Sequence, residues 1–300
     1  MNRARSQVGG YAIAMLVACS APAVVAEETV SFDPQHNPQT QQLADELAEQ
    51  GVPNAWLEQA LAQASYRQEV LDAMAGAAER RLRWFEYRDI FLTEQRIDEG
   101  AAFMKAHADA LARAESEYGV PPEVITAIMG VETYYGRHKG RHKVLDSLAT
   151  LAFHHPVRGD FFRGELAAFL TIAYQQEVAP ESLYGSYAGA MGYPQFIPTS
   201  YQAYAVDFDG DAKRDLWNNP VDAIGSVANY FAEHGWQRGG AIYHEAEGPE
   251  ELPEALSFNQ TVRPSTTAAE AAEQGVVTET SLTPDTPVVP LVLEYADGQE

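Results

Sequence analysis

The chain has 300 residues, of which 46% are hydrophobic and 21% charged, so it is long enough to bury a core without disulfides or other cross-links. Its 43 acidic and 20 basic side chains give a formal net charge of −23. This charge disfavours nucleic acid as a partner, because phosphate backbones require clustered Lys and Arg. Most of the charges are expected to form a solvated acidic surface.

The N-terminus predicts an export signal over residues 1–26. Arg3 and Arg5 precede an apolar run at 11–18, which is too short to span a membrane, and small residues follow it. We therefore expect an exported protein in the periplasm.

The only cysteine, Cys19, ends the stretch Leu16–Cys19. This stretch resembles the lipobox at which bacterial lipoproteins are cleaved and acylated, and an ordinary signal-peptidase site at 24–26 is the competing interpretation. With one cysteine the chain can form no internal disulfide. If Cys19 is lipidated, the following Ser20 is compatible with sorting to the outer membrane.

Residues 27–118 predict a helical domain of amphipathic helices. The first begins at Pro38 after an Asn37 cap and stops at Gly51, and the next begins at Asn54. A longer helix is predicted over 102–118, with Gly119 as its C-terminal cap.

We expect a second, mainly helical domain over residues 119–240. Pro121 and Pro122 open its first helix, because proline in the first turn removes no hydrogen-bond donor. Further helices are predicted at 160–177 and 221–235, whereas 184–219 is too rich in Gly, Pro and Asp for a long helix.

Residues 241–300 predict a short β-rich segment. Strand-like runs at 241–244 and 288–295 flank a stretch at 264–287 that is typical of a loop or linker. Asp297-Gly298 is a hairpin signal. Too few residues follow it for a returning strand, so we expect this segment to be incomplete and the chain to be truncated.

Glu132 lies at the end of the helix that begins at Pro122. The residues three, four, seven and eight positions earlier are all apolar, which predicts that its carboxyl lies on a buried stripe. Burial raises the pKa of a carboxyl and keeps it protonated for general acid catalysis. The alternative is a solvated glutamate, or one paired with Arg137 or Arg141.

The alternating aspartates at 207–211 indicate a calcium loop. Asp207, Asp209 and Asp211 occupy positions one, three and five of an EF-hand-like pattern, with the backbone carbonyl of Lys213 at position seven. Position six is Ala212 instead of the usual glycine. The alternative is a solvated acidic turn that caps the next helix.

The stretches Gly130–Thr133 and Ser186–Phe196 together resemble the B-type lytic murein transglycosylases, and the resemblance runs from about residue 33 to the end of the chain. It implies a mainly α, lysozyme-like α+β catalytic core after a helical domain. It also implies cleavage of peptidoglycan glycan strands into anhydromuramic acid ends, with Glu132 as the single acid and then base. No second carboxylate would take part, although Asp146, Asp160 and Glu165 lie nearby in sequence.

The same resemblance implies which residues bind the glycan: Ser186, Gln195, Phe196, Tyr87, Arg158 and Tyr230. From the residues alone, Tyr230 is equally compatible with a core position and Arg158 with a solvated surface. The sequence departs from the family at Pro194, where glycine is expected, and at Tyr134-Tyr135, where Arg-Trp is common.

The resemblance further implies that calcium has a structural role, with Asp222 completing the shell of loop 207–222, and that no organic cofactor is needed. The partners implied are peptidoglycan strands and, through Cys19, the outer membrane. Because peptidoglycan is rich in carboxylates, the acidity of the chain does not attract it to this substrate. Two rival functions are a goose-type hydrolase and a catalytically silent murein-binding protein, the latter because of the truncation.

Overall fold

The computed structural model describes residues 30–76, 82–260, 263–264, 266–296 and 298–299. The chain divides into residues 1–30 and one compact unit over Ser31–Glu300. The predicted signal at 1–26 and its Cys19 lie outside the described residues, and the domain boundaries at 118 and 240 stay predictions. No helix within the described ranges is long and apolar enough to cross a membrane.

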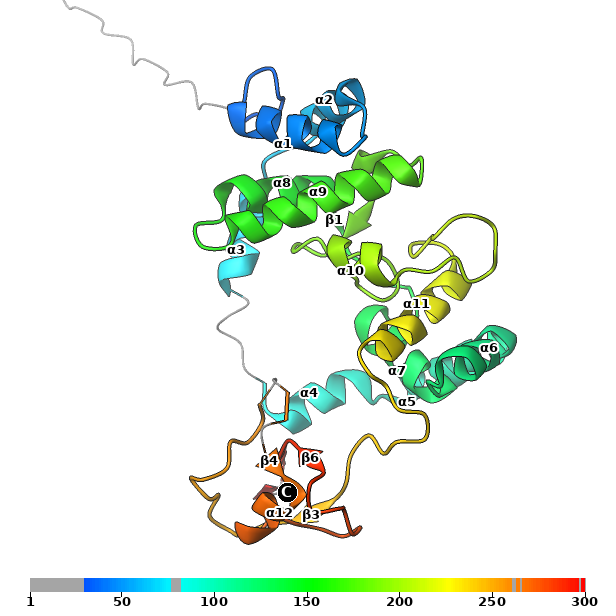
Figure 1. The fold of residues 1–300 in the computed structure, drawn as a ribbon, viewed down its shortest axis with the longest axis vertical. Helices are drawn as coiled ribbons and strands as arrows, with labels where there is room; N and C mark the ends of the chain where they lie inside the picture. Colours follow the sequence, from blue (N-terminus) through cyan, green and yellow to red (C-terminus); the bar gives the residue numbers. More distant parts are fainter. Residues whose placement is uncertain (1–29, 77–81, 261–262, 265, 297, 300) are drawn as a thin grey trace, which may run out of the picture. The chain divides into compact units, whose positions relative to one another are not determined.

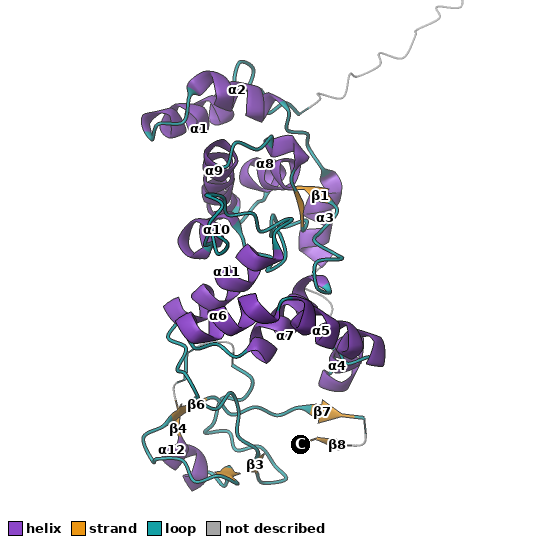
Figure 2. Ribbon diagram, turned by 90° about the vertical axis from the view of Figure 1, so that its right-hand side faces the viewer, coloured by secondary structure: helices purple, strands orange, loops and turns teal. Residues whose placement is uncertain are grey.

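Helices dominate the described unit, as Figures 1 and 2 show. The helices before the Glu132 helix are α1 (Pro38–Glu49), α2 (Asn54–Ala62), α3 (Gln68–Gly76), α4 (Trp84–Phe91), α5 (Glu94–Ala106) and α6 (Ala108–Tyr118). The remaining helices are α7 (Pro122–Thr133), α8 (Val144–His154), α9 (Gly159–Gln175), the 3-10 turn η1 (Pro180–Ser182), α10 (Pro198–Tyr204), α11 (Pro220–Glu233) and α12 (Ala268–Glu273).

The strands are two residues long and form antiparallel pairs. The pairs are β1 (His142–Lys143) with β2 (Tyr184–Gly185), β3 (Ala246–Glu247) with β5 (Val277–Thr278), β4 (Thr266–Thr267) with β6 (Pro287–Val288), and β7 (Glu294–Tyr295) with β8 (Gly298–Gln299).

Local end signals in the sequence act as predicted. The Asn37 side chain accepts hydrogen bonds from two backbone N–H groups in the first turn of α1. Gly119 ends α6 with φ +77, a left-handed conformation that glycine adopts at little cost. α7 begins at Pro122 as expected.

The single helix predicted over 102–118 is wrong, because His107 separates α5 from α6. His107 has non-helical angles (φ −117, ψ 25) and serves as the C-cap of α5 and the N-cap of α6. Its ring lies 4.5 Å from that of Phe103. The apolar stripe continues across the break, so periodicity alone could not detect it.

The predicted strand at 241–244 is also wrong, since β3 begins at Ala246. The stretch expected to be a loop contains α12, which opens with a capping box between Thr267 and Glu270. This Thr-x-x-Glu signal was present in the sequence and was missed.

The predicted strand at 288–295 exists only at its ends, with Pro290 between them. The hairpin prediction is confirmed by the pairing of Glu294–Tyr295 with Gly298–Gln299. The expectation that no returning strand exists is therefore wrong for these first residues.

One buried core extends over most of the helices, and within it α8 packs against α9; the two helices lie side by side in Figure 1. Leu145 and Leu148 of α8 and Leu166 and Phe169 of α9 are fully buried. α7 packs against α5, α6 and α11. These contacts hold the end of α7 in place from several sides.

Candidate active site

Glu132 lies in the last turn of α7, beside the residues that bury this helix. Met129, Gly130 and Thr133 are buried, and Glu132 on the neighbouring face is exposed. The prediction that the Glu132 carboxyl lies on a buried stripe is therefore wrong. The apolar stripe leaves the core at the end of the helix, so its last position opens to solvent.

The surrounding protein still desolvates this carboxyl in part, and this desolvation raises the pKa of Glu132 above 4.5. Among the described residues, no hydrogen bond or ion pair engages its side chain. Arg137, one of the two alternative partners, instead forms an ion pair with Glu99 at 2.8 Å. Glu132 therefore keeps a carboxyl that can hold and release a proton.

The loop that begins at Ser186 is closed by its own hydrogen bonds. The Ser186 hydroxyl accepts from the backbone N–H groups of Ala188 and Ala190, at 3.2 and 3.0 Å. Met191 and Phe196 exchange two backbone hydrogen bonds of 2.8 and 3.1 Å. The loop therefore has a defined shape.

Gln195 adopts a left-handed conformation with φ +51, a costly arrangement for a side-chain-bearing residue that is often found at functional sites. Its amide nitrogen donates to the carbonyl of Gly192 at 2.8 Å, and its backbone N–H bonds to the same carbonyl. Pro194, the first departure from the family, is buried inside this turn.

The two sequence motifs meet at Thr133. Its hydroxyl donates to the carbonyl of Tyr193 at 2.9 Å, and it accepts from the N–H of Gly136 at 3.1 Å. Because Thr133 directly follows Glu132, this bond fastens the Gln195 loop to the end of α7. The structure thus brings together the stretches that are some fifty residues apart in sequence.

Tyr134 and Tyr135, the second departure from the family, both adopt left-handed conformations (φ +52 and +55) and turn the chain sharply after α7. The Tyr135 ring lies against Gly130, where an added Cβ would come within 2.8 Å of it. Its hydroxyl donates to the carbonyl of Arg96 at 2.9 Å.

Arg96 was not singled out from the sequence, although it contacts the end of α7. Its guanidinium donates to the Gly130 carbonyl at 2.9 Å and lies 4.2 Å from the centre of the Tyr134 ring. A cation at a helix C-terminus complements the negative end of the helix dipole. No local pattern marks this residue, since its partners lie on another helix.

Two of the predicted glycan-binding aromatics lie together. The rings of Phe196 and Tyr230 are 5.5 Å apart, and Tyr230 stacks on His234 at 4.0 Å. Phe196 is only 8% exposed, so it packs mainly against its neighbours. Tyr230 is half-buried and supports this cluster.

Tyr87 of α4 is linked through its neighbours to the end of α7. It is 44% exposed and contacts Phe91 at 5.0 Å. Phe91 in turn lies 5.3 Å from the Arg96 guanidinium, which binds the end of α7. An exposed tyrosine on this route is available to stack on a sugar ring.

Arg158 is not linked by contacts to the other predicted site residues in the described part of the chain. It is the exposed N-cap residue of α9, and its guanidinium lies 4.4 Å from the ring of Phe161. No contact found in the described ranges joins it to Glu132 or to the loop at 186–196.

Two of the three other carboxylates considered as partners have structural roles. Asp146 is buried and accepts from Ser65 and from the side chain of Arg67. Glu165 is buried, and both of its oxygens accept from Thr199, at 2.9 and 2.7 Å. Asp160 is exposed in the first turn of α9.

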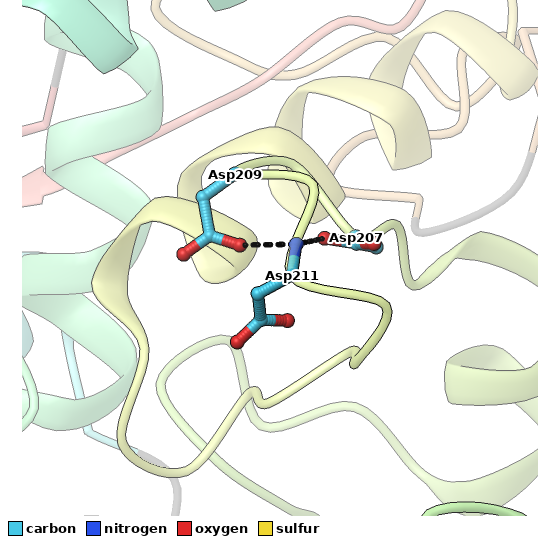
Figure 3. Close-up of side chains that lie close together, drawn as sticks. All are labelled: Asp207, Asp209 and Asp211. Atoms are coloured by element: carbon cyan, nitrogen blue, oxygen red, sulfur yellow. Dashed lines mark hydrogen bonds between the residues drawn. The ribbon is translucent and has the colours of Figure 1, made fainter.

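The aspartate loop gathers three carboxylates, as Figure 3 shows. One oxygen each of Asp207, Asp209 and Asp211 lies within 4.8 Å of the others. The N–H of Asp211 donates to both Asp207 and Asp209, at 3.1 and 3.3 Å. Ala212 at position six has φ +68, so alanine adopts the turn that glycine usually provides.

These donors fit a calcium ion chemically. A carboxylate has about four acceptor positions, so even Asp207, which accepts from three backbone N–H groups, keeps one for a cation. Lys213 follows in the loop, and its N–H donates to Asp211 at 2.8 Å. The Asn219 amide donates to the second oxygen of Asp209 at 2.8 Å, which ties the cluster to the start of α11.

Asp222 lies outside this cluster of described acidic residues. It is fully buried, and its two oxygens accept from the N–H groups of Phe208 and Asp215, both at 2.8 Å. It therefore joins the two arms of the loop, and its role as a calcium ligand stays a prediction.

Comparison with known proteins assigns the chain to a family. The sequence model of the transglycosylase SLT domain matches residues 35–300. The chain belongs to the transglycosylase SLT domain family. The resemblance inferred from Gly130–Thr133 and Ser186–Phe196 is thereby confirmed.

A curated relative is the membrane-bound lytic murein transglycosylase B of Escherichia coli K12, which is 44% identical over 223 residues. The match covers 71% of this chain and 62% of the E. coli protein, so the chain spans less than two thirds of that relative's length.

Solved structures of this family have the same fold. Catenated lytic transglycosylase SltB1 from Pseudomonas aeruginosa superposes with a TM-score of 0.84 at 44% identity, over 88% of this chain and 86% of that one. The E. coli lytic transglycosylase SLT35 in complex with calcium gives a TM-score of 0.80 at 39% identity, over 90% and 85%.

A more distant match is SltB3 from P. aeruginosa in complex with NAG-NAM-pentapeptide, with a TM-score of 0.73 at 32% identity, over 86% and 67% of the two chains. The predicted mainly α, lysozyme-like fold is confirmed by these superpositions.

Proposed function

We propose that this protein is a lytic transglycosylase that cleaves the glycan strands of peptidoglycan, with Glu132 as its only catalytic acid and base. The observation that carries the proposal is the position of Glu132. It lies at an exposed helix end, with a raised pKa and no ion-pair partner within the described ranges. The Gln195 loop is fastened to its neighbour Thr133.

The proposed reaction requires one carboxyl in two protonation states. Protonated Glu132 donates its proton to the glycosidic oxygen as the bond to the muramic acid C1 breaks. The resulting carboxylate then takes the proton of that sugar's C6 hydroxyl, and O6 bonds to C1 to give the 1,6-anhydro ring. No water is consumed, and Glu132 ends the cycle protonated.

The engagement of Asp146 and Glu165 favours this reaction over hydrolysis by two carboxylates. Both side chains are buried, and their hydrogen bonds join distant parts of the fold. Neither carboxylate is therefore free to activate a water or to stabilise a charged sugar. Half-buried Tyr230, which packs on Phe196, and exposed Tyr87 offer ring surfaces for the glycan.

Replacement of Glu132 by Gln tests the proposal. The variant should fold normally and release no anhydromuropeptides from murein, because the amide keeps the size of the side chain and loses the transferable proton. Glu123→Gln, in the first turn of the same helix, is the matched control and should stay active. Products heavier by one water would identify a hydrolase, and wild-type-like release by Glu132→Gln would refute the assignment.

We further propose that loop 207–222 binds calcium in a structural role. The support is the grouping of Asp207, Asp209 and Asp211 and the calcium complex of SLT35. The ion would neutralise three carboxylates that otherwise repel one another.

Periplasmic location with a lipid anchor at Cys19 is proposed from the export signal and from the membrane-bound E. coli relative. Cys19→Ala, or globomycin treatment, should leave the protein unprocessed or soluble in the periplasm. An unchanged membrane fraction with an N-terminus at Glu27 would favour the ordinary signal peptide instead.

A further inference from the structure

A cationic segment follows the candidate catalytic helix. Residues 137–143 read Arg-His-Lys-Gly-Arg-His-Lys, and they hold four of the chain's 20 Lys and Arg residues and none of its 43 acidic ones. In a chain with a net charge of −23, the sign of the charge is thus reversed locally, just beyond Glu132.

Two close approaches fix this segment against the Gln195 loop. A Cβ on Gly136 would lie 2.0 Å from the Tyr193 ring, and one on Gly140 would lie 1.9 Å from the Gly185 carbonyl oxygen. Both glycines have positive φ, +87 and +100, which glycine tolerates best. The cations therefore project from a backbone held in one place.

The strand register sets one of these cations beside the site. β1 pairs with β2 antiparallel, with His142 opposite Gly185 and Lys143 opposite Tyr184. Arg141 lies between Gly140 and His142 in the chain, and both of these neighbours lie against Gly185. Gly185 directly precedes Ser186, so Arg141 lies next to the start of the Ser186 loop.

The contacts within the segment show which cations are available. Arg137 is paired with Glu99 at 2.8 Å, and the Lys139 ammonium donates to a carbonyl of the aspartate loop. Arg141 is exposed and Lys143 half-exposed, and in the described part of the chain neither forms an ion pair. Arg141 and Lys143 are thus free to meet an anion.

We propose that Arg141 and Lys143 bind carboxylates of the peptide stems carried by the muramic acid residues, so that the enzyme prefers peptide-bearing glycan over bare glycan. This rests on the proposed function. An acidic protein repels a substrate rich in carboxylates, and cations at the site offset this repulsion locally. A guanidinium also matches the two oxygens of a carboxylate.

The test compares Arg141→Gln, Lys143→Gln and the double variant with Lys105→Gln, an exposed cation on α5. Three substrates are used: glycan with its stems, the same glycan with the stem carboxyls converted to amides, and amidase-stripped glycan, which keeps only the lactyl carboxylate. Each of the two site variants should raise KM about two- to fivefold on the first substrate, the range expected for one exposed ion pair.

The expected pattern has further parts. The kcat values should be unchanged, and KM on the amidated and stripped substrates should not move. Arg141→Lys keeps the charge without the two-oxygen geometry and should recover part of the loss. Equal effects on all three substrates, or no effect on any, would overturn the proposal. A loss that persists on stripped glycan would identify the lactyl carboxylate as the partner and would also overturn it.

Binding separates this inference from the catalytic proposal. Calorimetry of disaccharide-pentapeptide binding to Glu132→Gln protein, with and without Arg141→Gln, needs no turnover. Weaker binding of the native ligand, with unchanged binding of its amidated form, supports the stem contact even if the wild-type chain cleaves nothing. Equal weakening of both forms contradicts it.

Discussion

Replacing Gly130 by Ala tests whether the packing of Tyr135 positions the Glu132 turn. The new Cβ would lie 2.8 Å from Cε1 and Oη of Tyr135 and 2.9 Å from Cζ, all well inside van der Waals contact. The ring cannot easily move, because it stacks on Phe103 at 5.7 Å and its hydroxyl donates a hydrogen bond to the Arg96 carbonyl.

Two effects of opposite sign determine the stability of this variant. Alanine is favoured over glycine inside a helix by about 1 kcal/mol, and overpacking a tight site costs about 1–3 kcal/mol. Gly164→Ala in α9 is the matched control, since nothing lies within 4 Å of its Cβ position. It should gain up to about 1 kcal/mol, so the difference between the two variants isolates the overlap, about 1–3 kcal/mol.

Chemical denaturation measures both unfolding free energies, and murein turnover reports whether Glu132 is displaced. Gly130→Ala should be less stable than Gly164→Ala and less active than wild type. Adding Tyr135→Leu should remove the extra penalty of the alanine, because the overlapping ring is gone. Equal stability of the two alanine variants, or an undiminished penalty in the Leu background, would refute the reasoning.

Four further predictions concern charged groups. Turnover should fall as the pH rises through the pKa of Glu132, which lies above 4.5, because the acid must be protonated. A kcat/KM profile whose decrease is already complete below pH 4.5 would contradict this. The folded state binds this proton more tightly than the unfolded state, so the stability contributed by Glu132 is present at low pH and lost as the pH rises through its folded pKa. Glu132→Gln should therefore melt higher than wild type at neutral pH and equally at acidic pH. Calcium should raise the melting temperature of metal-stripped protein, and Asp209→Ala should abolish that rise while Asp160→Ala keeps it; no rise in the wild type would exclude the site. Asp146→Asn should cost about 2 kcal/mol in denaturation, below the usual cost of breaking a buried pair because the Arg67 side chain is 43% exposed. An unchanged unfolding midpoint would show that this ion pair contributes nothing.

Local chemistry made much of the fold predictable from the sequence. Helix ends at Asn37, Gly119 and Pro122 depend on hydrogen bonds and backbone angles within a few residues, so the sequence determines them directly. The family motifs at Glu132 and Ser186 were likewise evident from residue types and spacing. The capping box at Thr267 is an equally local signal, and it is sufficient to predict the start of α12.

Only the tertiary structure determined the solvent exposure of the acidic side chains and their hydrogen-bond partners. Periodicity placed Glu132 on an apolar stripe, and only the packing around α7 determines that this stripe ends in solvent. Asp146 and Glu165 lost their candidate catalytic roles through contacts with Ser65, 81 residues away, and with Thr199, 34 residues away. The packing of the helices determines these partners, because the sequence around a carboxylate does not indicate which donor will form a hydrogen bond to it.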